Sequence, residues 1–117
     1  MRALLLLLLL SPGASLAREE SPGRQVDFGL KVAQKGLWQE ARFRFERAVE
    51  LDPQNAAALN DLGVALEQMA EFEAARKAYE KALQLKPGDV YIQQNYDLFR
   101  EADDKRNRKS RKKAPKP

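Results

Sequence analysis

With 117 residues the chain is long enough for a single domain, and the absence of cysteine and histidine narrows the chemistry open to that domain. Without cysteine there are no disulfides, so the stability of the fold must come from packing. The net charge of +4 is unevenly distributed, because residues 18–104 hold twelve basic and seventeen acidic residues, whereas residues 105–117 hold eight basic residues and no acid. A mildly acidic body with a strongly basic C-terminal segment is therefore expected.

The first residues have the pattern of an export signal. Arg2 supplies a positive charge, residues 4–10 are an unbroken run of leucine, and small residues follow up to Ala17. The leucine run is far shorter than the roughly 20 apolar residues that span a bilayer. We therefore expect a signal peptide over residues 1–17, cleaved near Ala17, and an exported protein, periplasmic or secreted. An uncleaved N-terminal membrane anchor is the alternative.

After a linker at residues 18–24, the spacing of apolar residues is helical as far as Asp104 and predicts five helices. In chain order they are marked by residues 28–32, 38–49, 59–69, 72–83 and 89–104. Only a few residues separate the first helix from the second and the third from the fourth, which favours two antiparallel pairs. Pro53 and Pro87 end the second helix of each pair, and Asp89 is placed to cap the fifth helix.

Thirteen residues recur 34 positions apart, as ARFRFERAVELDP at residues 41–53 and ARKAYEKALQLKP at residues 75–87. Six of these positions are identical, and three more keep their chemistry. A sustained period of this length is typical of stacked helical repeats, which are more often binding modules than catalysts.

The repeated small residues predict close helix contacts. The second helix of each pair carries alanines seven positions apart, at Ala41 and Ala48 and again at Ala75 and Ala82. Small side chains on one helical face let neighbouring axes approach, while larger side chains between them, here Phe45 and Tyr79, fill the groove beside them. Gly29 and Gly63 are expected to allow the same close approach on the first helix of each pair.

These positions resemble the tetratricopeptide repeat (TPR), whose 34-residue pattern runs Trp, Leu, Gly, Tyr, Ala, Phe, Ala and Pro. The second copy, residues 56–89, supplies Leu59, Leu62, Gly63, Leu66, Ala75, Tyr79, Ala82 and Pro87. The first copy, residues 22–55, supplies Phe28, Gly29, Val32, Ala41, Phe45, Ala48 and Pro53, with Gln25 where the family prefers Trp. The resemblance implies an all-α fold, a short right-handed α-solenoid of two TPR helical hairpins plus a C-terminal solvating helix over residues 90–104.

The first repeat departs further from the pattern than the second. Pro22 and Gly23 are a poor helix start, and Gly23 together with Gly29 raises the entropic cost of ordering this helix. Two repeats are also fewer than the three or more that usually make a stable stack. We therefore expect fraying of residues 22–35, and a core that a partner or a second copy of the chain can complete.

The residue inventory argues against catalysis. Residues 18–117 contain no Cys, His or Thr, and their two serines, Ser21 and Ser110, are expected in flexible flanks. Acid–base catalysis by carboxylates stays open in principle, but Glu67, Glu71 and Glu73 beside a turn are more typical of a solvated surface. No catalytic residue, metal site, cofactor or small-molecule substrate is predicted.

In the TPR family the first helices of successive hairpins line a concave surface that holds an extended peptide or a partner helix. The resemblance assigns to this groove Val26, Leu30 and Gln34, then Asn60, Val64 and Gln68, then Tyr91, Gln94, Asn95 and Leu98, with Asp61 also facing inward. Carboxamides both donate and accept hydrogen bonds, which suits a peptide backbone, and Asn60 is the first candidate. In the alternative interpretation, Asn60 and Asn95 only bridge neighbouring helices and Leu98 is core.

One variant of the family grips C-terminal carboxylates with cations in this groove. Here those positions hold Val26, Leu30, Asp61, Tyr91 and Asn95. A neutral or basic peptide therefore suits the acidic body better than an acidic one.

Residues 105–117 are expected to be a disordered tail, because they combine dense positive charge with proline and contain no large apolar residue. Their cations include Lys105, Arg106, Arg108, Lys109, Arg111, Lys112 and Lys113. Such a tail binds an anionic surface, whether membrane, cell-wall polymer or nucleic acid, or serves only to keep the chain soluble. We expect a protein-binding adaptor, with an anionic-surface binder scaffolded by the helices as the alternative.

Overall fold

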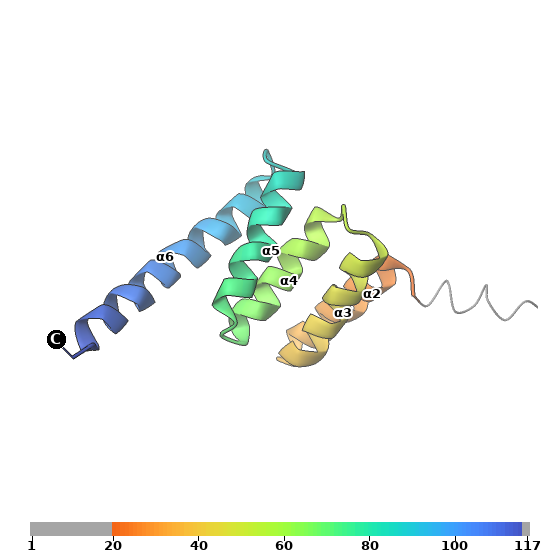
Figure 1. The fold of residues 1–117 in the computed structure, drawn as a ribbon. Coiled ribbons are helices and arrows are strands. Elements are labelled where there is room, and N and C mark those ends of the chain that lie inside the picture. The colour runs from red at the N-terminus through yellow and green to blue at the C-terminus, as the bar shows by residue number, and fades with distance from the viewer. Residues whose placement is uncertain (1–19, 116–117) are drawn as a thin grey trace, which may run out of the picture.

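The computed structural model describes residues 20–115, which form a stack of helices in chain order (Figure 1). The helices are α2 (Pro22–Gln34), α3 (Trp38–Leu51), α4 (Ala56–Gln68), α5 (Phe72–Leu85) and α6 (Val90–Lys113). α2 and α3 form one hairpin, and α4 and α5 form another. The two hairpins contact each other through α3 and α4, and α6 lies against α5 and α4. The predicted all-α fold of two hairpins and one further helix is confirmed. The predicted signal peptide at residues 1–17 lies outside the described residues.

Side-chain caps begin three of the helices. The side-chain oxygen of Asn55 accepts a hydrogen bond from the backbone of Ala58 at 3.0 Å, and that of Asp89 accepts one from Ile92 at 3.0 Å, as expected for Asp89. Ser21 caps α2 by accepting from the backbone nitrogen of Arg24 at 3.3 Å. Ser21 is therefore part of an ordered helix start, and its expected place in a flexible flank is wrong.

The turns inside the two hairpins use equivalent backbone conformations. Gly36 has a φ of +76°, and Ala70, which lies 34 positions later, has a φ of +60°. This left-handed conformation ends a helix and turns the chain back within a few residues. Glycine adopts it freely, whereas the alanine of the second hairpin adopts it at some cost.

The repeated small residues lie at the helix contacts, as their spacing predicts. Ala41, Ala48, Ala75 and Ala82 have no exposed surface. A Cβ added to Gly29 would lie 2.5 Å from the ring of Phe45, and one added to Gly63 would lie 2.9 Å from the ring of Tyr79. In each hairpin, an aromatic side chain of the second helix therefore packs directly on glycine backbone of the first.

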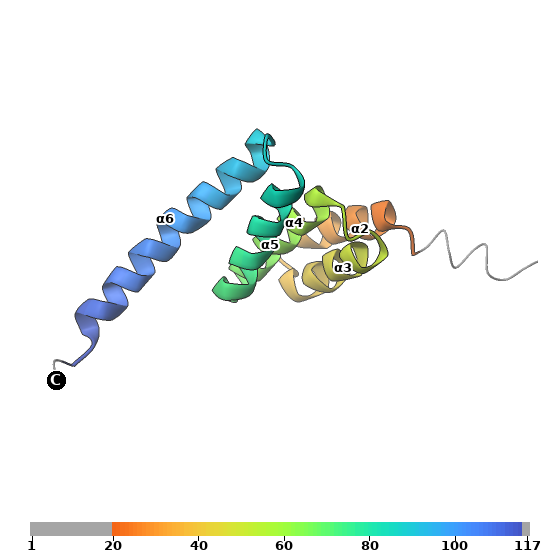
Figure 2. The ribbon, with the colours of Figure 1, turned by 45° about the horizontal axis from the view of Figure 1, so that its top comes forward.

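α6 differs from its expected length. The helix was expected to end near Asp104 before a disordered tail, but it continues to Lys113 and extends past the other helices (Figures 1 and 2). Ser110 consequently lies within α6 and not in a flexible flank.

Local features account for the extra length of α6. Lysine and arginine are good helix formers, and Arg111, Lys112 and Lys113 in the last turn interact favourably with the negative end of the helix dipole. The helix stops at Ala114, whose extended conformation (φ −66°, ψ 134°) is the one favoured before a proline.

Candidate functional site

The predicted binding positions lie on α2, α4 and α6, which are the first helices of the two hairpins and the helix that follows them. Val32 of α2 and Ala65 of α4 belong to one core cluster with Phe45 of α3, which connects the two helices. Residues 34 positions apart are equivalent in the repeat, and we call one such set, Leu30, Val64 and Leu98, the apolar row. We call the ten predicted binding positions the α2–α4–α6 surface.

The apolar side chains of this surface reach solvent on α2 and α6. Leu30 is 42 % exposed, Tyr91 is 64 % exposed and Leu98 is 66 % exposed, while Val26 and Val64 are partly buried. Gln34, Gln68 and Gln94 are exposed as well. The alternative interpretation of Leu98 as a core residue is therefore wrong, and apolar groups are available for contact with a ligand.

Asn60 and Asn95 form a bridge between α4 and α6. The side-chain nitrogen of Asn95 donates a hydrogen bond to the side-chain oxygen of Asn60 at 3.0 Å, and that of Asn60 donates to Asp61 at 3.4 Å. Only 1 % of Asn60 is exposed, whereas Asn95 is partly buried. For this pair the geometry favours the alternative interpretation, in which the two carboxamides connect neighbouring helices. Asn60 is thus better placed to orient the surface than to contact a ligand.

Asp61 of α4 is an acidic group beside this surface. Its carboxylate is partly buried, and burial raises its pKa to about 6, although the hydrogen bond from Asn60 acts in the opposite direction. A carboxylate held in a poorly solvated position is stabilised by any cation that approaches it. The resemblance predicts that Asp61 faces inward, but its burial depends on neighbours that are distant in sequence and could not be predicted.

The predicted anion-binding cations lie on the last turns of α6. Lys105, Arg108, Lys109, Arg111, Lys112 and Lys113 are exposed there. Arg106 differs from the others, because its guanidinium lies 3.5 Å from the centre of the Phe72 ring and donates to Asp103 at 3.2 Å. Arg106 thus fastens α6 to α5 and is less available to an external anion.

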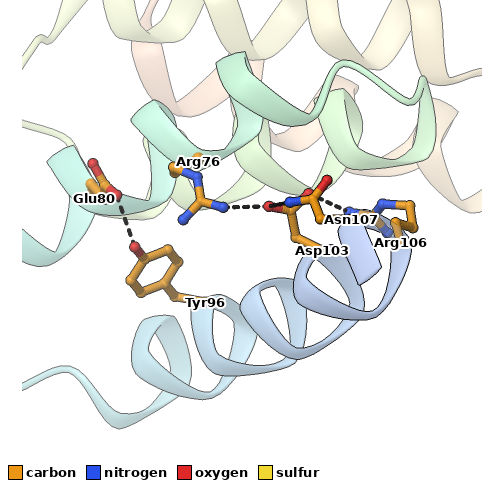
Figure 3. Close-up of polar contacts among 6 residues, drawn as sticks. All are labelled: Arg76, Glu80, Tyr96, Asp103, Arg106 and Asn107. Carbon is orange, nitrogen blue, oxygen red and sulfur yellow. Dashed lines mark hydrogen bonds and ion pairs between the residues drawn. The ribbon is translucent and has the colours of Figure 1, made fainter. Parts of the chain in front are cut away.

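Asp103 is the centre of a polar network between α5 and α6 (Figure 3). Its side chain is only 8 % exposed and accepts hydrogen bonds from Arg76 of α5 and from Arg106 and Asn107 of α6. Nearby, the hydroxyl of Tyr96 donates to Glu80 at 2.8 Å. These contacts hold α6 against α5 along most of the length of α5.

The acidic residues beside the second turn have structural partners. Glu67 accepts a hydrogen bond from the hydroxyl of Tyr79 at 3.0 Å, and Glu71 forms an ion pair with Arg42 at 2.6 Å. Within residues 20–115 no group of acidic side chains is arranged to hold a metal ion. The same part of the chain contains no helix that is both long and apolar enough to cross a membrane.

Known proteins share this arrangement of paired helices. Residues 27–90 match the family described as tetratricopeptide repeat. Among solved structures, the crystal structure of the Sgt2 TPR domain from Aspergillus fumigatus matches with a TM-score of 0.72 at 20 % sequence identity, covering 90 % of this chain and 81 % of that one. No curated protein matches the chain.

Proposed function

Because the chain belongs to the tetratricopeptide repeat family, we propose that it is a non-enzymatic adaptor that binds a peptide or helix of another protein across the α2–α4–α6 surface. The observation that carries this proposal is the solvent exposure of Leu30 and Leu98 at equivalent positions on α2 and α6. With Val64 between them, they offer a row of apolar contacts on the helices that bind ligands in this family. Exposed glutamines beside the row supply hydrogen-bonding groups.

The electrostatics of this surface favour a neutral or basic ligand. Asp61 lies on α4 beside the apolar row, and its burial leaves the charged form poorly solvated. A lysine, arginine or terminal amine of the ligand would stabilise that charged form and gain an ion pair in return. An acidic peptide would meet the same carboxylate with like charge.

Paired surface variants test the proposal. Leu30→Ser combined with Leu98→Ser removes apolar contact from both ends of the row, and both side chains already reach solvent, so the fold should be retained. Phe43→Ser combined with Leu51→Ser is the matched control, since these exposed apolar residues lie on α3, which contributes no residue to the α2–α4–α6 surface. Helicity is compared by circular dichroism.

The readout is capture of partners from the native host. We expect the first pair to lose the proteins captured by the natural chain, and the control pair to retain them. Equal capture by both pairs would remove the α2–α4–α6 surface from consideration.

The second candidate function is binding of an anionic surface through α6. Six exposed cations on a helix that extends past the stack favour it, because charge in this position meets a flat surface before the rest of the molecule does. Deletion of residues 105–117 should abolish such binding, and raising the salt concentration should weaken it steeply. Undiminished binding of anionic vesicles or polymers after the deletion, or binding that does not respond to salt, would exclude this candidate.

Export of the chain is a further part of the proposal. The pattern of residues 1–17 supports it, and the mature protein is then periplasmic or secreted. Sequencing the N-terminus of the protein isolated from its host gives a direct test. A first residue just after Ala17 is expected, whereas an intact N-terminus found in the membrane fraction would indicate the uncleaved anchor.

A further inference from the structure

One face of α6 is exposed along nearly the whole helix. Its residues follow one another at alternating steps of three and four, a spacing that places them on one line of a helix. They are Tyr91, Gln94, Leu98, Glu101, Lys105, Arg108 and Lys112, and all seven are exposed. We call this line the α6 seam. The opposite face of the helix is the one that packs on the stack, where Ile92, Phe99 and Asp103 are buried.

The chemistry of the α6 seam changes along the helix. Its first half presents apolar surface at Tyr91 and Leu98, and its second half presents only cations from Lys105 onward. Lys109 and Arg111 lie beside the second half and are also exposed, which increases the positive charge there. The groove beside Asp61 and the far end of α6 therefore have opposite electrostatic character.

We propose that the α6 seam docks a helix of another protein, and that the matching line of that helix is apolar in one half and acidic in the other. The inference rests on the proposed adaptor function and adds a docking line along α6 to it, because Tyr91, Gln94 and Leu98 belong both to the α6 seam and to the α2–α4–α6 surface. Apolar side chains of the partner contact Tyr91 and Leu98. Its carboxylates contact Lys105, Arg108 and Lys112.

Geometry and charge both support a helical partner. A repeat of 3.5 residues is the spacing with which two helices maintain contact over several turns. The 24 residues of α6 provide about 36 Å of contact length at 1.5 Å per residue. The Asp103 network already orders the middle of this helix against α5 (Figure 3), so little conformational entropy is lost when a partner docks. Facing charges of opposite sign then determine which half of the partner lies where.

A second copy of the chain fits the α6 seam poorly. In a parallel pair, the cationic half of one helix faces the cationic half of the other. In an antiparallel pair, those cations face Tyr91, Gln94 and Leu98, and Glu101 is the single acid on the line. Repulsion or unpaired charge opposes both arrangements.

A bilayer is also a poor match for the α6 seam. Helices that lie in a membrane surface separate their apolar and charged residues around the circumference. Here Leu98 and Lys105 share one line, so inserting the leucine brings the lysine toward the same depth.

Synthetic peptides provide the test. The probe is a helical peptide of about three heptads, with leucine on its contact line in one half and glutamate in the other, made in both orders to allow parallel and antiparallel docking. The matched probe has lysine in place of glutamate. Binding of each labelled peptide to the full chain is measured by fluorescence anisotropy. We expect the acidic probe, in one of its two orders, to bind at least about tenfold more tightly than its lysine counterpart.

Charge reversal on α6 should invert this preference. Lys105→Glu combined with Lys112→Glu is expected to favour the lysine probe, whereas Lys77→Glu combined with Lys81→Glu, at exposed positions of α5, should leave the preference unchanged. Leu98→Ser should weaken both probes, because both use the apolar half. Leu30→Ser, which alters the α2–α4–α6 surface alone, should change neither, so the two proposals fail separately.

Several results would overturn the inference. One is equal affinity for the acidic and lysine probes, and another is loss of preference in the α5 control variant. The α6 seam would be assigned to a membrane if the peptides fail to bind while the full chain binds vesicles that contain phosphatidylserine. Leu98→Ser and the combined Lys105→Glu and Lys112→Glu variant would then abolish the vesicle binding. The α6 seam would be assigned to self-association if sedimentation velocity shows dimers of the full chain and the same variants dissociate them.

Discussion

Individual small residues determine how closely the helices of this protein pack. Ala75 has no exposed surface and belongs to a cluster with Leu66, Tyr79 and Phe99, which come from α4, α5 and α6. Gly63 leaves room for the ring of Tyr79 at a distance that a methyl group would prevent. The chain has no disulfide to compensate for a poor fit, so volume at these positions bears directly on stability.

Enlarging Ala75 should therefore destabilise the stack. Ala75→Leu adds three carbons where no space is available, and we expect it to lower the free energy of unfolding by about 1–3 kcal/mol. Ala74→Leu is the control, because Ala74 is an exposed neighbour on the same helix. Urea unfolding followed by circular dichroism compares the two, and an unchanged midpoint for Ala75→Leu would contradict the packing account.

Asp61 should make stability depend on pH. Burial raises its folded-state pKa from 3.8 to about 6, so between these values the folded chain retains a proton that the unfolded chain releases. The contribution of this group to stability is therefore greatest below pH 3.8, falls as the pH rises toward 6, and is lowest above it.

The variant Asp61→Asn removes this titration. We expect the variant to be more stable than the natural chain at pH 7 and nearly equal to it near pH 3.5, as measured by the urea midpoint at each pH. Asp97→Asn, at an exposed position of α6, should show no such difference. A stability gain for Asp61→Asn that is the same at both pH values would not be due to ionisation.

At the scale of the element, the packing of α6 against α5 depends on one buried carboxylate. Asp103 accepts hydrogen bonds from two arginines, and Arg106 also stacks on Phe72. The Asp103 network fixes the helix just before its last turns, where within the described residues α6 extends past the rest of the stack. Removing the carboxylate would leave two cations without their common partner.

Asp103→Ala should consequently loosen the end of α6. We expect a loss of about 1–3 kcal/mol in unfolding free energy, modest for a buried ion pair because both arginines reach solvent. Amide hydrogen exchange should become faster over residues 104–113. Asp104→Ala is the matched control at the adjacent exposed position, and equal exchange in the two variants would show that the last turns are ordered by helix propensity alone.

At the scale of the whole molecule, stability should decrease toward the N-terminal hairpin. α2 buries Gln25, Gly29 and Val32, whereas α4 buries seven residues, because α4 is packed between neighbours and α2 is not. In a stack of repeats each unit is stabilised by its neighbours, so a terminal helix opens first.

Hydrogen exchange of the natural chain can measure this gradient. Amides of residues 22–35 should exchange well before those of residues 56–68, since opening α2 exposes little apolar surface. Binding of a ligand across the α2–α4–α6 surface should slow exchange in α2. Equally slow exchange in both segments of the free protein would contradict the expected weakness of the first repeat.

Most of the fold follows from local signals in the sequence. The spacing of apolar residues, the prolines and the cap at Asp89 predicted the five helices, their pairing and the start of α6, because these signals act within a few residues. The caps at Ser21 and Asn55, which begin α2 and α4, were missed. The length of α6 was missed because the dense charge of residues 105–113 favours disorder, whereas their helix propensity and the contact of Asp103 with Arg76, 27 residues earlier in the chain, favour a helix. The sequence left open whether Asn60 contacts a ligand or bridges two helices, because its partner Asn95 is 35 residues away. Contacts of this range depend on how the helices stack.

The helical state of the cationic segment also bears on how long the protein survives. Trypsin-like proteases cut after lysine and arginine, but they need the chain to enter their active site in an extended form. Residues 105–113 would be the preferred cleavage site of an unfolded tail, whereas in α6 each of these bonds is protected until the helix end unwinds. We therefore expect the Asp103 network, by holding α6 against α5, to slow proteolysis of residues 105–113.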